Sequence, residues 1–413
     1  MAEPPSPPDG GPGLRIALVY DCLYPNTIGG AERVYRNLAE HLNQRHEVTY
    51  ITRRQWGEEG PRTSFETVAV SPGGPLYAAS GRRRFGPPLR FGLGVFWHML
   101  RHGHRYDAVQ TISVPMFPIL GTVAAIRLRR LRPRVVVDWF EVWTREYWLS
   151  YMGPLAGRLG FAVQRLCARL PDQSFTYSRL FEQRLRSYGH RAPITRLTGA
   201  YTEPPEIGPP RPRPPDRAPF ALFAGRHIPE KSVPAVPPAI AAARAEIPGL
   251  RCVILGDGPD TEATRALAGR LGLAEEVEIR GRVEASEVAE AMATAACLIH
   301  PSIREGYGLV VVEAAARGTP VVVCAAPDNA ATELVEEGIN GFVARSEKPA
   351  DLAAAIVAAI NGGEALRAST WDWYQRNREA LSLESSLRAI EASYGAPPSG
   401  AVGEADEPRR PRP

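Results

Sequence analysis

The stretch "SIREGYGLVVVEAAARGTPVVV", residues 302–323, indicates one unit of a parallel β-sheet. The short apolar runs Cys297–His300 and Pro320–Cys324 are typical of buried strands. Between them, the alanine-rich run Leu309–Ala316 favours a helix, and Gly318 is typical of a helix end. The order strand, glycine loop, helix, strand predicts a βαβ unit. Its loop lies at the carboxyl end of the first strand, where open α/β sheets bind ligands.

The same stretch contains two glutamates, Glu305 before the expected helix and Glu313 within it. With a rise of about 1.5 Å per residue, their carboxylates would lie about 12 Å apart. That is too far for a general acid and base acting on one bond, but it suits the two hydroxyl-bearing ends of a nucleotide sugar. The amides from Gly306 to Leu309 would suit phosphate oxygens. Two solvated surface glutamates are the alternative, and the spacing alone does not decide between them.

The composition is that of a soluble globular protein, with 44% hydrophobic and 23% charged residues among 413. The formal net charge is only +4, and no basic stripe is interleaved with aromatics, which argues against a nucleic-acid partner. Five scattered cysteines without a CxxC pair predict reduced core thiols in a cytoplasmic protein. No motif indicates a metal site, and no uninterrupted apolar run reaches transmembrane length.

The alternation of strands and helices predicts an α/β protein with two Rossmann-like domains that face each other across a cleft. Residues 14–202 form the expected first domain and residues 218–370 the second, joined by a proline-rich linker at 203–217. One helix at 371–395 is expected to pack back on the first domain. Residues 1–13 are expected to be a disordered lead rather than a signal peptide, and 396–413 a disordered tail. The expected strands are Leu14–Tyr20, Glu47–Thr52, Ala108–Ser113, Arg134–Trp139, Ser174–Ser178, Phe220–Ala224, Cys252–Leu255, Val277–Arg280, Cys297–His300 and Val321–Cys324.

Two cations follow the first strand of the second domain, in "AGRHIPEKS" at residues 224–232. Arg226 and Lys231 on one loop suit a pyrophosphate leaving group. The chain has only two lysines, Lys231 and Lys348, among 49 Lys and Arg residues. An ammonium in a chain that otherwise uses arginine favours a specific role for Lys231, with two ordinary surface charges as the alternative.

Two further loops are expected at the cleft. Gly29 and Gly30 precede a helix predicted at 31–42, where an ordinary strand-to-helix turn is the alternative. Arg282 and Val283, at the end of "IRGRV", would present main chain to a nucleotide base.

The ordered set "IGGAERV", "AGRHIPEK", "LGDGP", "RGRV", "HPSIREGYGLVVVEAAARGTPVV" and "GINGFVAR" resembles glycosyltransferase family 4. The resemblance runs from about Leu14 to Gly395. It implies the GT-B fold and a retaining transferase that uses a nucleotide sugar, UDP- or GDP-linked, with no other cofactor and no metal. It also implies that Arg226 and Lys231 hold the donor diphosphate and stabilise the leaving group, and that Glu305 contacts the donor sugar. Glu313 would bind the ribose. The remaining donor-binding positions are Gly29, Gly30, Arg282, Val283, Gly306, Tyr307, Gly308 and Leu309.

One position departs from the family pattern. Many relatives carry a histidine after the fourth strand of the first domain, where this chain has Phe140 in "VVVDWFEVW". Asp138 and Glu141 are nearby carboxylates and candidates for the acceptor side of the site. Ordinary turn residues are an equally good interpretation of both.

The segment "GRRRFGPPLRFGLGVFWHML", residues 81–100, would suit an anionic lipid or a lipid-linked acceptor. We favour the alternative, a solvated arginine cluster beside a core helix. The residues that suggest a membrane surface are Arg82, Arg83, Arg84, Phe85, Phe91, Phe96 and Trp97.

The combined prediction is a cytoplasmic retaining hexosyltransferase, with peripheral contact at the inner membrane face as an option and an unidentified acceptor hydroxyl. A nucleotide-sugar epimerase of similar fold is one rival, and the "PEK" and E-x7-E loops argue against it. A non-catalytic subunit that binds a sugar nucleotide is the other, and Phe140 makes it less remote.

Overall fold

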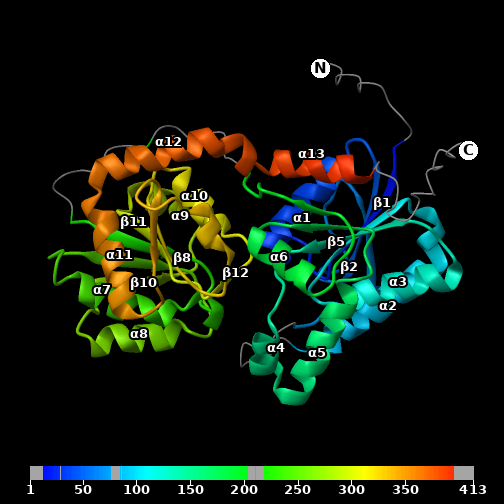
Figure 1. The fold of residues 1–413 in the computed structure, drawn as a ribbon, viewed down its shortest axis with the longest axis horizontal. Helices are drawn as coiled ribbons and strands as arrows, with labels where there is room; N and C mark the ends of the chain where they lie inside the picture. The colour runs from blue at the N-terminus through cyan, green and yellow to red at the C-terminus, as the bar shows by residue number, and fades with distance from the viewer. Residues whose placement is uncertain are drawn as a thin grey trace, which may run out of the picture.

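A computed structural model describes residues 13–27, 29–75, 84, 86–202, 210 and 218–394 (Figure 1). Most of the expected lead and linker, and all of the expected tail, lie outside these residues. The described chain forms two α/β bodies side by side, with two helices near the carboxyl end running along one edge of both.

The first domain contains a parallel sheet of seven strands in the order β3-β2-β1-β4-β5-β6-β7. Alternate residues of the strand at 15–19, an inner strand of this sheet, belong to two clusters on opposite faces: Ile16 and Leu18 to one, Ala17 and Val19 to the other. Both faces are therefore covered, as is usual for a parallel sheet. The strands are β1 (Arg15–Val19), β2 (Glu47–Arg53), β3 (Glu66–Ser71), β4 (Ala108–Ile112), β5 (Arg134–Trp139), β6 (Gln173–Thr176) and β7 (Ile194–Arg196), and the helices α1 (Gly30–Leu42), α2 (Gly86–His102), α3 (Phe117–Arg129), α4 (Arg145–Met152), α5 (Pro154–Cys167) and α6 (Arg179–Ser187).

The second domain repeats this plan with a parallel sheet of six strands, in the order β10-β9-β8-β11-β13-β15. Ala221 and Phe223 face one apolar cluster, while Leu222 and Ala224 face the other. A separate two-stranded pair, β12 with β14, lies in the loops. The strands are β8 (Phe220–Ala224), β9 (Arg251–Leu255), β10 (Val277–Gly281), β11 (Cys297–His300), β12 (Arg304–Glu305), β13 (Val321–Cys324), β14 (Asp328–Asn329) and β15 (Gly341–Ala344), and the helices α7 (Val236–Ala243), α8 (Thr261–Arg270), α9 (Ala285–Thr294), α10 (Leu309–Ala315) and α11 (Pro349–Asn361).

The prediction of one helix at 371–395 is wrong in its bounds. Helix α12 (Gly363–Leu381) begins within the expected second domain, and α13 (Leu383–Tyr394) follows after a break at Ser382. The break coincides with main-chain hydrogen bonds from Tyr201, whose nitrogen donates to Leu381 O at 3.2 Å and whose oxygen accepts from Leu383 N at 2.8 Å. Packing on the first domain is as expected, because Glu391 on α13 pairs with Arg45 at 3.2 Å.

The α/β prediction with two parallel sheets is confirmed. All ten expected strands are present. The edge strands β3, β7 and β15, none of which is fully buried along its length, were missed, as were the two-residue strands β12 and β14. Within the described ranges, no helix combines the length and the apolar character needed to cross a membrane.

Candidate functional site

The glycines of the 302–323 loop are explained by close packing where the two domains meet. Gly308 precedes α10 with a φ of 101°, in the left-handed region, and a Cβ there would lie 2.7 Å from the Cβ of Ala331. A Cβ on Gly306 would lie 2.6 Å from the main-chain oxygen of Phe140, just after β5. The glycine loop therefore contacts the first-domain position where the family pattern has a histidine.

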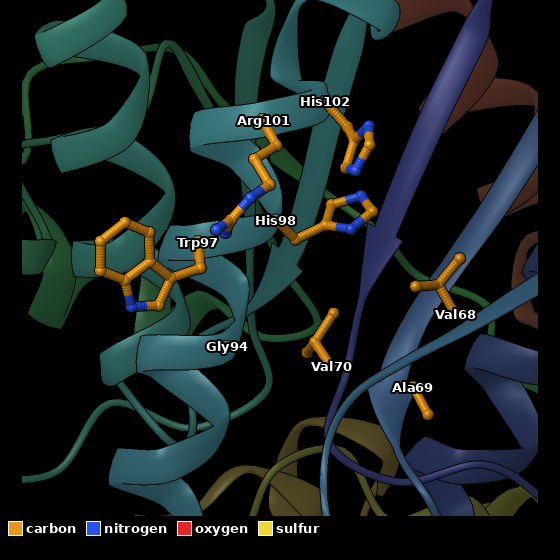
Figure 2. Close-up of a pocket in the computed structure, with 8 residues that line it drawn as sticks. All are labelled: Val68, Ala69, Val70, Gly94, Trp97, His98, Arg101 and His102. Carbon is orange, nitrogen blue, oxygen red and sulfur yellow. The ribbon is translucent and has the colours of Figure 1, made fainter.

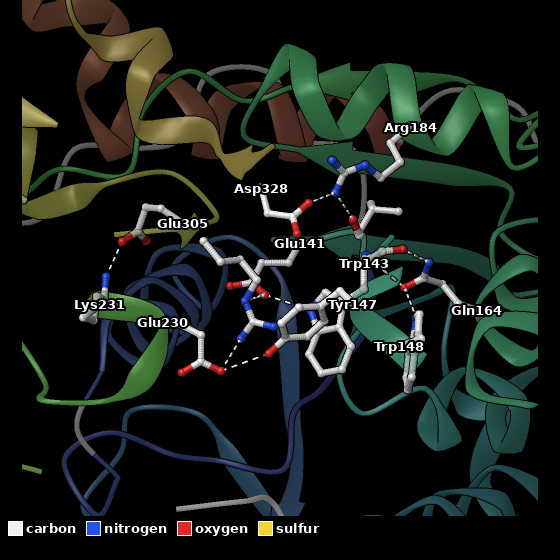
Figure 3. Close-up of polar contacts among 12 residues, drawn as sticks. Glu141, Trp143, Tyr147, Trp148, Gln164, Arg184, Glu230, Lys231, Glu305 and Asp328 are labelled. Atoms are coloured by element: carbon white, nitrogen blue, oxygen red, sulfur yellow. Dashed lines mark hydrogen bonds and ion pairs between the residues drawn. The ribbon is translucent and has the colours of Figure 1, made fainter. Parts of the chain in front are cut away.

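Glu305 is the centre of a polar cluster on the second-domain side of this boundary. Its Oε2 pairs with the Nζ of Lys231 (Figure 3) and accepts a hydrogen bond from His300 Nε2 at 2.9 Å. The side chains of Glu305 and Lys231 are 17% and 18% exposed. Burial raises the pKa of the Glu305 carboxyl, but Lys231 and the His300 hydrogen bond outweigh it and bring the pKa well below its ordinary value. Two of the three predicted catalytic residues thus meet as an ionised pair.

His300 was missed as a site residue, although it ends a predicted strand. Its side chain is 2% exposed, and burial, aided by the charge of Lys231, lowers the pKa of the imidazole. Ser302 Oγ lies 3.1 Å from the same Nε2. A polar residue that closes an apolar strand at the carboxyl edge of a sheet is the signal that would have found it.

Glu313 lies in a different environment. Its Oε1 pairs with Arg33 Nη2 of α1 at 3.3 Å, so it bridges the two domains. Burial raises the pKa of this carboxyl, while Arg33 and Arg317 oppose the rise. The two glutamates of the motif therefore have separate cationic partners. Arg33 was not among the predicted residues.

The remaining cation of the predicted diphosphate site is free. Arg226 is exposed after β8 and forms no ion pair within the part of the chain that is described. Arg282 is exposed as well, whereas Val283 packs at the edge of a second-domain apolar cluster.

Gly29 and Gly30 lie where α1 begins, beside the start of α10. A Cβ on Gly30 would be 4.0 Å from Leu309 Cδ2, and one on Gly29 would collide with the carboxylate of Glu32. Tyr307 also contacts the first domain, because its hydroxyl donates to Thr198 O at 2.7 Å. The predicted donor residues Gly30, Tyr307 and Leu309 thus lie at the boundary between the domains.

The two acceptor-side candidates differ in location. Asp138 is 1% exposed and accepts hydrogen bonds from the Tyr35 hydroxyl and from Gln110 Nε2, the latter at 2.6 Å. Burial raises the pKa of Asp138 to about 6, although both hydrogen bonds oppose the rise. Glu141 instead reaches the second domain, where its Oε2 lies 3.2 Å from Arg304 Nε.

Two open surface pockets lie elsewhere. One, of about 450 Å³, lies between β3 and α2 and is lined by Trp97, His98, Arg101 and His102 among others (Figure 2). The other, of about 370 Å³, lies between α6 and the loop after β13. Neither is lined by Lys231, Glu305 or Glu313.

Relatives and solved structures resemble this chain to different extents. D-inositol 3-phosphate glycosyltransferase of Geodermatophilus obscurus is 34% identical over 184 residues, which cover 42% of this chain and 40% of that protein. Sucrose-phosphate synthase of Thermosynechococcus elongatus has a TM-score of 0.72 at 19% identity, covering 92% of this chain and 98% of that one. HepE of Anabaena, solved in complex with UDP-glucose, has a TM-score of 0.68 at 17% identity, covering 92% and 99%. The two structures share the fold.

Family models match both domains. The model described as "Glycosyl transferase 4-like domain" matches residues 29–198, and "Glycosyl transferases group 1" matches residues 208–373. Together they span most of both sheets, in the order that the GT-B fold requires. The chain therefore belongs to the glycosyltransferases of family 4, with the GT-B fold.

Proposed function

We propose that this protein is a retaining glycosyltransferase that moves a hexose from a UDP- or GDP-linked sugar to an acceptor hydroxyl. The observation that carries the proposal is the buried Lys231–Glu305–His300 cluster beside the glycine loop, with Arg226 free on the same loop as Lys231. HepE, a neighbour in fold, was solved with UDP-glucose, which supports a nucleotide sugar as the donor.

In the proposed reaction the bond between the anomeric carbon and the diphosphate oxygen breaks, and the acceptor oxygen bonds to that carbon from the same face. The acceptor proton passes to the departing phosphate oxygen. Arg226 and Lys231 would stabilise the negative charge that develops on the diphosphate, without a metal ion. Glu305 would orient the sugar hydroxyls and hold Lys231 in place, and Glu313 would accept hydrogen bonds from the ribose.

The test is a panel of nucleotide sugars, scored by donor hydrolysis and thermal shift, and repeated with a chelator. Lys231→Ala and Glu305→Gln should each lower kcat on the order of 10²–10³-fold. Lys348→Ala is the matched control, because it removes the only other lysine, which is exposed at the start of α11. Unchanged turnover in both site variants would refute the assigned roles.

The products separate the rival functions. An epimerase would convert one nucleotide sugar into another without an acceptor. A non-catalytic subunit would show a thermal shift with a nucleotide sugar but no turnover. Transfer of the sugar to an added hydroxyl acceptor would exclude both.

We also propose cytoplasmic location with peripheral membrane contact through α2. Leu89, Leu93 and Trp97 are spaced four residues apart and are 47%, 53% and 51% exposed, so they form an apolar stripe. Phe91, expected on this surface, is fully buried, while Arg82, Arg83 and Phe85 lie outside the described residues. Leu93→Glu should abolish sedimentation with anionic vesicles, and equal sedimentation of wild type and variant would overturn the proposal.

A further inference from the structure

Two loops of the second domain are joined by a pair of adjacent ion pairs. Lys231 pairs with Glu305, and the residues just before them, Glu230 and Arg304, pair at 3.1 Å. A main-chain hydrogen bond of 3.0 Å from Ile303 N to Glu230 O fastens the same two loops. Because successive side chains of an extended strand point to opposite sides, Glu305 faces His300 while Arg304 faces the first domain. The inner pair belongs to the proposed donor site, and the outer pair does not.

The first domain supplies a pocket for the Arg304 side chain. The guanidinium carbon lies 4.8 Å from the ring centre of Trp143 and 4.3 Å from that of Tyr147, and Nε lies 3.2 Å from Glu141 Oε2. Tyr147 also donates from its hydroxyl to Glu230 at 3.0 Å (Figure 3). The Arg304 side chain is only 13% exposed in this position. Separation of the domains would remove both rings and the Glu141 carboxylate from the cation.

The walls of this pocket are joined by hydrogen bonds within the first domain. Gln164, on α5 and fully buried, accepts from Trp143 N at 3.1 Å and donates to Trp143 O at 2.7 Å. Its Oε1 also accepts from Trp148 Nε1 at 3.2 Å. Trp143 Nε1 in turn donates to Glu141 Oε2 at 2.9 Å, which fixes the carboxylate that Arg304 meets. An organised pocket requires little ordering of the first domain when the cation docks.

We propose that Arg304 is a positioning residue that couples closure of the first domain to the alignment of Lys231 and Glu305. The inference rests on the proposed function for its effect on catalysis, but not for its effect on closure. Docking of Arg304 fixes Glu305 through the peptide bond between them and fixes Lys231 through Glu230. An arginine suits this place because its planar cation stacks on aromatic rings while it pairs with two carboxylates, Glu230 and Glu141, which a compact ammonium does less well.

The test compares variants on both sides of the boundary. Arg304→Gln should lower kcat on the order of 10–100-fold, because the reacting groups lose their alignment, with a smaller change in donor KM. Tyr147→Phe, which removes one hydroxyl, and Trp143→Leu should lower kcat in the same direction although they lie in the other domain. Arg304→Lys should restore part of the loss. Arg244→Gln, which breaks an ion pair with Glu276 inside the second domain, is the matched control and should leave kcat unchanged.

The combination of variants decides the outcome. Arg304→Gln with Tyr147→Phe should lose less activity than the product of the two single losses, since both act through one contact. Small-angle scattering without any ligand should show a larger radius of gyration for Arg304→Gln than for wild type. If the losses of activity of the two single variants are independent and the radius of gyration is unchanged, the proposed coupling role is wrong. Arg304 would then have only a structural role in its own domain. If wild type transfers no sugar from any donor, the proposed function fails. The scattering comparison would still test whether Arg304 holds the two domains together.

Discussion

At the scale of single residues, burial separates the two acceptor-side carboxylates that were predicted together. Asp138 and Glu141 are three positions apart, yet the first is 1% exposed in the core and the second contacts Arg304 of the other domain. Asp138 ends up inside because it belongs to β5, which is buried along its whole length, whereas Glu141 follows the end of that strand. A carboxylate in such a core is expected to affect stability more than catalysis.

Asp138 should make stability depend on pH. Its pKa is raised from 3.8 to about 6 by burial, so the folded state binds its proton more tightly than the unfolded state. The favourable contribution of protonated Asp138 to the free energy of unfolding is complete below pH 3.8. It is lost as the pH rises through about 6. The free energy of unfolding of Asp138→Asn should therefore rise by about 2 kcal/mol relative to that of wild type between pH 4 and pH 7. Urea unfolding at both pH values measures this difference, and an equal pH dependence in both proteins would contradict it.

At the scale of elements, the loop before α10 requires glycine at two positions, Gly306 and Gly308, for different structural reasons. Gly308 is needed by the loop itself, because of its positive φ and its contact with Ala331. Gly306 is needed only because Phe140 of the first domain lies against it. The backbone of the second domain therefore requires glycine at 308, whereas glycine at 306 is required only by the contact with the first domain.

These two requirements predict different results for alanine. Gly308→Ala should destabilise the second domain by about 1–3 kcal/mol, since a non-glycine residue in this backbone region is strained. Gly306→Ala should leave the melting temperature near that of wild type but lower kcat, because its methyl group obstructs contact with Phe140. Thermal unfolding and turnover measured on both variants check the contrast. Gly269→Ala on α8, where a Cβ meets no atom within 4 Å, is the control; it should leave kcat unchanged and should not lower the melting temperature, because alanine favours a helix over glycine.

At the scale of the whole molecule, α13 contributes the carboxyl-terminal part of the described chain to the core of the amino-terminal domain. Ile390 and Leu387 belong to the same apolar cluster as Tyr35 and Leu38 of α1. Ser386 on this helix donates to Gly199 O at 2.6 Å. The first domain is thus incomplete without residues that follow the second.

Ile390→Ala should destabilise the first domain by about 2–4 kcal/mol, because Ile390 is 2% exposed and its removal leaves a cavity. Hydrogen exchange measures the effect separately in each domain. Amides of α1 and β1 should exchange faster, while those of β8 and β11 should keep their protection. Equal loss of protection in both domains would instead mean that they unfold as one unit.

The sequence predicted the strands that carry apolar runs, because burial on both faces of a parallel sheet leaves an uninterrupted signal. It missed β3, β7 and β15 at the sheet edges, where partial exposure weakens that signal. It indicated Lys231 because the chain has only one other lysine, and Glu305 because of its place in the glycine loop and the family resemblance. It did not indicate His300, which was interpreted only as the end of a strand. It did not indicate Arg33 either, which is one of two arginines on α1 in a chain rich in arginine.

The sequence by itself determined two doubly wound domains and the glycine loop with its two glutamates, since hydrophobic period and glycine placement are local properties. Only the tertiary structure decided which charges pair across the boundary. Arg304 has its partners at Glu141, Trp143, Tyr147 and Glu230, which lie between 74 and 163 residues away in the chain. No local pattern encodes such contacts, because they join segments far apart in the chain that only the tertiary fold brings together.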